Sequence, residues 1–134
     1  YVFGVEESVA MFHRVRNHFG VNRLGQAAAL AALQDQPWLD HILALTSSCR
    51  DRIGSIARSH GFGPIPSATN FVTIDCGRDA AYAKAILDGL VSRGVFIRMP
   101  GVAPLNRCIR ISTGPDAEIG LFEAALAEVV AELG

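Results

Sequence analysis

The fold is decided by the stretch Asn70-Phe71-Val72-Thr73-Ile74-Asp75-Cys76, in which apolar and polar residues alternate. A period of two with several β-branched residues is typical of a strand that is buried on one face only. The segment before it, residues 61–66, contains two glycines and two prolines and predicts a loop. The stretch therefore predicts a sheet strand that is entered from a loop.

Further elements follow this strand toward the C-terminus. Asp79 can cap a helix that ends at Arg93-Gly94, and residues 95–98 and 107–112 read as a second and a third strand. A last helix begins at Gly114-Pro115-Asp116. This order predicts an α+β fold, with a small, mostly antiparallel sheet of about three strands and helices packed on one face.

The N-terminal part of the chain reads as helical. Apolar residues recur at helical spacing over 6–16, and Asn22 can cap a second, alanine-rich helix. A third helix is predicted from about Pro37 to His60. We therefore expect three parts: leading helices over 1–36, a long connecting helix over 37–60, and a small α+β domain over 61–134.

Composition and charge exclude several classes of protein. The chain has 134 residues, of which 50% are apolar and 19% charged, as in a globular protein rather than a disordered one. A net charge of −1 favours neither nucleic acid nor an anionic membrane. No apolar run reaches the ~18 to 20 residues of a membrane span. Because the chain begins with tyrosine rather than methionine, we expect a piece of a longer protein.

Familiar catalytic and metal motifs are absent from the sequence. Cys49, Cys76 and Cys108 form no CxxC pair, so neither a disulfide framework nor a zinc site is expected. Reduced, partly buried cysteines are typical of a cytoplasmic protein. The sequence contains no HExxH, GxSxG or GxxxxGK[ST] motif, and we expect no metal site.

Arg98 and Arg110 lie in or at the end of apolar strand segments. If Ile109 and Ile111 pack on the helices, Arg110 points away from the other face of the sheet. A guanidinium group offers a planar fork of donors that suits a carboxylate or a phosphate. Spacing alone leaves two interpretations open, an anion ligand or a solvated arginine, and it favours the second.

The run Leu105-Asn106-Arg107-Cys108-Ile109-Arg110-Ile111-Ser112-Thr113-Gly114, followed by a helix, resembles the C-terminal motif of the fold-type I aminotransferases. The histidinol-phosphate aminotransferase branch is the most similar. Three further segments resemble that branch in the same order and cover essentially the whole chain, namely residues 15–22, 67–71 and 94–98.

The resemblance implies a pyridoxal 5'-phosphate (PLP) enzyme that transfers an amino group from an amino acid or amino-phosphate to a 2-oxo acid such as 2-oxoglutarate. It implies that Arg110 binds the substrate carboxylate and that Arg98 helps to hold the substrate's anionic end. Tyr1 and Asn22 become candidate pocket-lining residues. The resemblance also implies a homodimer and makes residues 1–36 the end of a large cofactor-binding domain.

The chain has one lysine, Lys84, and PLP chemistry needs a lysine that binds the cofactor. Lys84 lies in the middle of a predicted helix, and we expect it to be solvated. In the family, the cofactor lysine and most phosphate-binding residues precede the position of Tyr1. We therefore expect no catalytic or cofactor-binding residue in this chain, and no activity from the chain alone.

Two alternatives remain open. A PLP-dependent decarboxylase of the same branch would share the scaffold. A non-enzymatic α+β module for ligand binding or oligomerisation would share the small sheet, although the leading helices argue against it.

Overall fold

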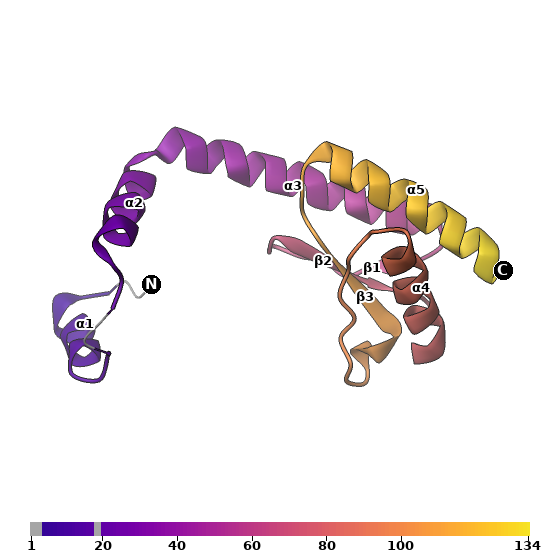
Figure 1. Ribbon diagram of the computed structural model, residues 1–134, viewed down its shortest axis with the longest axis horizontal. Helices are drawn as coiled ribbons and strands as arrows, with labels where there is room; N and C mark the ends of the chain where they lie inside the picture. Colours follow the sequence, from indigo (N-terminus) through magenta and orange to yellow (C-terminus); the bar gives the residue numbers. More distant parts are fainter. Residues whose placement is uncertain (1–3, 18–19) are drawn as a thin grey trace. The chain divides into compact units, whose positions relative to one another are not determined.

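The computed structural model describes residues 4–17 and 20–134. By its internal contacts the chain divides into two compact units, Tyr1–Leu39 and Asp40–Gly134. Figure 1 labels the elements of both units.

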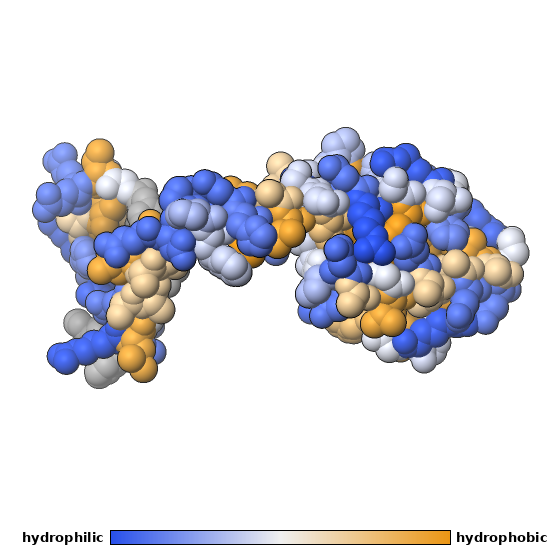
Figure 2. Space-filling view, turned by 90° about the horizontal axis from the view of Figure 1, so that it is seen from above, coloured by the Kyte–Doolittle hydropathy of each residue, from blue (hydrophilic) through white to orange (hydrophobic). Residues whose placement is uncertain are grey.

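The first unit contains helices α1 (Glu6–His13) and α2 (Arg23–Gln34). The Asn22 side chain caps α2, since its Oδ1 accepts the Gly25 N–H at 2.7 Å, as the sequence predicts. Helix α1 ends before the predicted Arg16. Both helices lie wholly within the described ranges and bury no residue, and Leu24 is 83% exposed. Apolar side chains are accordingly visible on the surface of this unit (Figure 2).

Helix α3 (Gln36–Ser59) matches the predicted third helix closely. Its buried residues recur at helical spacing in the C-terminal half: Cys49, Ile53, Ile56 and Ala57. The apolar side chain of Leu45, in the N-terminal half, is 52% exposed. Gly61 follows the helix with φ +76°, a conformation that suits glycine at a helix C-terminus.

The second unit holds an antiparallel sheet in the order β1 (Gly63–Pro64), β2 (Phe71–Asp75), β3 (Cys108–Ser112). Strand β1 lies in the segment predicted to be a loop. It is an edge strand, where a proline that lacks an N–H is tolerated.

The predicted strand over residues 95–98 is wrong in extent. Only Arg98 pairs with the sheet, through a single bridge to Arg110. The N–H of Val95 is still used to close the end of the preceding helix, where it donates to the Leu90 carbonyl at 2.9 Å. The chain therefore reaches the sheet edge late, and Pro100 follows two residues after Arg98 without an N–H to continue the pairing.

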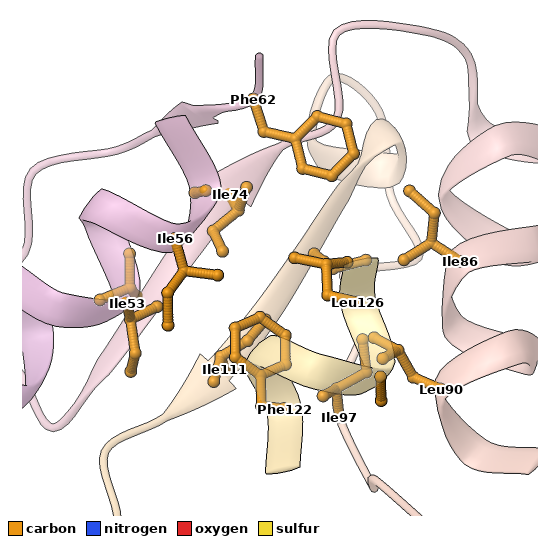
Figure 3. Close-up of a cluster of buried hydrophobic side chains, with 14 of the residues drawn as sticks. Ile53, Ile56, Phe62, Ile74, Ile86, Leu90, Ile97, Ile111, Phe122 and Leu126 are labelled. Atoms are coloured by element: carbon orange, nitrogen blue, oxygen red, sulfur yellow. The ribbon is translucent and has the colours of Figure 1, made fainter. Parts of the chain in front are cut away.

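Two more helices complete the second unit, α4 (Ala80–Ser92) and α5 (Asp116–Leu133), with a short 3₁₀ helix η1 at Leu105–Arg107. Asp79 caps α4 as predicted, accepting the Tyr82 N–H at 2.9 Å. The core lies between one face of the sheet and helices α3, α4 and α5 (Figure 3). Side chains that meet there include Ile53, Ile74, Ile86, Ile111, Phe122 and Leu126. Each contributes about 1.5 to 3 kcal/mol through burial.

The three cysteines are free and buried. Burial raises the pKa of the Cys76 thiol to about 12, so this thiol remains protonated at neutral pH. Across residues 4–17 and 20–134, no helix is long and apolar enough to span a membrane. In the same residues, no group of three or more His, Cys, Asp or Glu side chains is arranged to hold a metal ion.

Candidate anion-binding site

Arg98 and Arg110 lie directly opposite each other at the edge of the sheet. The Arg98 N–H donates to the Arg110 carbonyl at 3.1 Å, and the Arg110 N–H donates to the Arg98 carbonyl at 2.7 Å. Residues paired in this way project their side chains from the same face, with Cβ atoms about 5 Å apart. Since Ile109 and Ile111 are buried against the helices, that face is the one turned away from the core.

Each guanidinium group lies over a phenylalanine ring. The Arg110 Cζ is 4.8 Å from the Phe71 ring centroid, and the Arg98 Cζ is 5.3 Å from that of Phe96. Both distances are within the range of a cation–π interaction. The sequence prediction did not assign either ring a role. The available signal was the spacing of Phe96 and Arg98, because residues two apart in an extended segment share a face.

Within the described residues, neither Arg98 nor Arg110 forms a salt bridge, in contrast to three other arginines. Like charges placed directly opposite each other across a strand pair destabilise the sheet. An anion bound between them would offset that repulsion. The arrangement therefore suits a ligand that carries a carboxylate or a phosphate group.

The acidic side chain of Asp75 on this face already has hydrogen-bond partners. Asp75 lies on the same face of β2 as Thr73, which pairs with Arg110. Its carboxylate accepts the Gly77 N–H at 2.9 Å and also pairs with the Arg107 guanidinium. These two hydrogen bonds hold the pKa of Asp75 below its usual range despite partial burial. Asp75 is thus ionised, but it is engaged by its own partners rather than by Arg110.

The two arginines differ in how firmly they are held. Arg110 is half-buried in the middle of β3 and pairs with Thr73 on its other side. Arg98 is exposed and joins the sheet through its one bridge. The site therefore combines one fixed donor group with one at the open edge.

The other predicted site residues lie elsewhere. Asn22 is exposed, and its side-chain oxygen is used to cap α2. Tyr1 lies outside the described residues. Lys84 is exposed, and its ammonium group contacts both carboxylate oxygens of Asp88, at 2.5 and 2.6 Å. A solvated ammonium paired with a carboxylate on the next helical turn does not fit a lysine that binds PLP.

Comparison with known proteins defines the class. The family described as Aminotransferase class I and II matches residues 1–126. The chain therefore belongs to the class I and II aminotransferase family.

Particular relatives within this class are histidinol-phosphate aminotransferases. The chain is 40% identical to histidinol-phosphate aminotransferase 2 of Methylococcus capsulatus over 96% of its own length and 34% of that protein. It is 35% identical to histidinol-phosphate aminotransferase 1 of Mesorhizobium japonicum, with the same coverage of 96% and 34%.

A solved structure gives the same result. The crystal structure of histidinol-phosphate aminotransferase from Sinorhizobium meliloti in complex with pyridoxal-5'-phosphate is 57% identical to the chain, with a TM-score of 0.90. The match covers 96% of this chain and 35% of that one. The chain thus spans about a third of the length of the relatives it matches.

Proposed function

We propose that the protein containing this chain is a PLP-dependent aminotransferase, and that Arg98 and Arg110 bind the anionic groups of its substrates. The observation that carries this proposal is the pair of arginines that lie directly opposite each other in the sheet, neither with a salt-bridge partner in the described residues. Membership of the aminotransferase family supports the class of reaction. The names of the similar proteins support an amino-phosphate, histidinol phosphate, as the donor.

The role of the site in this proposal is to bind and orient the substrate. Arg110 offers a planar fork of N–H donors to a carboxylate or phosphate, and Arg98 supplies a second positive group beside it. Holding the anionic end of a substrate fixes where its amino carbon lies, which lowers the entropy lost on the way to reaction. A 2-oxo acid acceptor such as 2-oxoglutarate carries carboxylates that the same pair suits.

The cofactor chemistry is assigned to other parts of the protein. PLP, when bound, supplies the electron sink for amino transfer. Because Lys84 does not fit a cofactor lysine, we propose that this chain alone is inactive and contributes the substrate-binding portion.

The whole protein is proposed to contain a large and a small domain. We assign residues 1–36 to the end of a large cofactor-binding domain, 37–60 to a connecting helix and 61–134 to the small domain. We further propose that the complete protein is a homodimer, which its mass in solution would test.

The test is to substitute the arginines in the full-length enzyme and to measure kcat/KM with histidinol phosphate. Arg110→Gln should lower kcat/KM roughly 30-fold or more, because charge-assisted hydrogen bonds to the substrate are lost. This factor corresponds to a loss of about 2 kcal/mol in stabilisation of the transition state. Arg98→Gln should change the preference among donors more than the activity with any one of them.

Arg78→Gln provides a matched control. The Arg78 Cζ lies 4.2 Å from the Tyr82 ring centroid, so this substitution also removes an arginine stacked on an aromatic ring, but in the segment between β2 and α4. The control should retain wild-type kinetics. Equal kcat/KM for the Arg110→Gln and Arg78→Gln variants would remove Arg110 from the site.

A further inference from the structure

The direction of the Arg110 side chain is set by a neighbour on the next strand. Phe71 pairs with Ser112, and Thr73 pairs with Arg110, so Phe71 and Arg110 are diagonal neighbours on one face of the sheet. Diagonal neighbours are far enough apart that contact requires a long side chain to lean along the strand. With its Cζ 4.8 Å from the Phe71 ring centroid, the Arg110 guanidinium leans toward the residue 71 end of the strand pair.

The backbone of Phe71 is held by three hydrogen bonds with nearby side chains. Its carbonyl accepts the Ser67 hydroxyl at 2.6 Å and the Thr69 hydroxyl at 3.3 Å. Its N–H donates to the Thr69 hydroxyl oxygen at 3.3 Å. The adjacent Asn70 carbonyl accepts both the N–H and the hydroxyl of Thr113, at 2.9 and 3.1 Å, which ties this entry turn to the end of β3.

Over residues 4–17 and 20–134, the ring beside Arg98 has no comparable hydrogen-bonded support. Phe96 is 75% exposed and lies in a segment that is not a strand. Phe71, in contrast, is half-buried at the start of β2. The two stacked pairs are therefore unequal, and only the Phe71 ring sits on a backbone fixed from both sides.

We infer that Phe71 is a positioning residue, whose ring, held by the hydrogen-bonded turn of residues 67–70, presets the Arg110 guanidinium for the anionic group of the substrate. This inference rests on the proposed function. A side chain that is already ordered loses less conformational entropy when its ligand binds, so the ring should strengthen binding without taking part in the chemistry. Its effect should therefore appear in KM rather than in kcat.

The experiment is a double-mutant cycle in the full-length enzyme, with histidinol phosphate as the variable donor. Phe71→Leu removes the ring and keeps an apolar side chain. It should raise KM about threefold to tenfold with little change in kcat, in line with a partly exposed cation–π contact. In the Arg110→Gln background, Phe71→Leu should have no further effect on KM, since the two residues act as one unit. Phe71→Tyr keeps the ring and should restore the wild-type KM.

Three results would count against the inference or its basis. An unchanged KM in Phe71→Leu, beside a raised KM in Arg110→Gln, overturns the positioning role alone. An equal rise in both backgrounds, not rescued by Phe71→Tyr, also overturns it, because the ring would then be a packing residue. An unchanged KM in Arg110→Gln overturns the proposed function, and the inference with it.

Discussion

The packing of α4 against α5 predicts opposite effects for two glycine-to-alanine substitutions. Gly89 lies within α4, and a Cβ atom built on it would lie 2.8 Å from both Cγ atoms of Val129 in α5. In folded proteins a Cβ atom essentially never comes closer than 3.0 Å to a heavy atom of a residue elsewhere in the chain. Val129 is 2% exposed in a close-packed core, so it has little room to move away.

The expected change in the free energy of unfolding of Gly89→Ala is the sum of two opposing contributions. Alanine in place of a helical glycine stabilises by about 1 kcal/mol, whereas forcing an extra carbon into a packed core costs about 1 to 3 kcal/mol. Gly89→Ala should therefore lower the free energy of unfolding by about 1 kcal/mol, taking the middle of that range. In a domain of this size, such a loss lowers Tm by about 4 to 8 °C.

Gly120→Ala in α5 is the matched control. Its added Cβ would meet only Arg52 Nη2, at 3.7 Å, an ordinary contact. Without a clash, the helix-propensity term stands alone, and we expect a gain of about 0.5 to 1 kcal/mol. Urea unfolding followed by circular dichroism measures both variants. The reasoning is refuted if Gly89→Ala is as stable as Gly120→Ala.

Three more predictions concern titrating groups. The pKa of Asp75 is lowered in the folded state, so its carboxylate stabilises the fold at pH values above the usual carboxyl pKa. This stabilisation is lost as the pH falls through the pKa of the folded state. The urea midpoint of unfolding between pH 2 and 7 should therefore vary less in Asp75→Asn than in the wild type. Because its pKa is raised to about 12, the Cys76 thiol should not react with iodoacetamide at pH 8 in the folded chain, but should react fully in urea. Rapid alkylation of Cys76 in the folded chain would contradict this prediction. Lys84→Ala should change the free energy of unfolding by less than about 0.5 kcal/mol. After PLP is added to this chain and removed by dialysis, borohydride should leave Lys84 unmodified; an adduct at Lys84 that survives dialysis contradicts its assignment to the solvated surface.

Local rules explain why much of the fold is predictable from the sequence. Asn22 and Asp79 cap their helices because the short side chain of each accepts an N–H three residues later. The alternation over residues 70–76 places Val72 and Ile74 in the core. The predicted strand over 95–98 is wrong in extent because the Val95 N–H donates to the Leu90 carbonyl at the end of α4, a contact that an apolar run does not reveal.

The site is less predictable because it depends on register between distant segments. Alternation places Arg110 on the outer face, but only the bridge brings Arg98 opposite it. Likewise, spacing could not show that Arg107 rather than Arg110 pairs with Asp75. These pairings decide which guanidinium groups have no salt-bridge partner among the described residues, and they support the anion-ligand interpretation, which stays a prediction.

The most direct test of the central claim is an amino-transfer assay on the complete gene product, with PLP, 2-oxoglutarate and a panel of amino donors that includes histidinol phosphate. We predict amino transfer from histidinol phosphate, and its loss in the Arg110→Gln variant. Release of carbon dioxide without amino transfer would instead indicate a decarboxylase, and failure to bind PLP would contradict the proposed enzyme altogether.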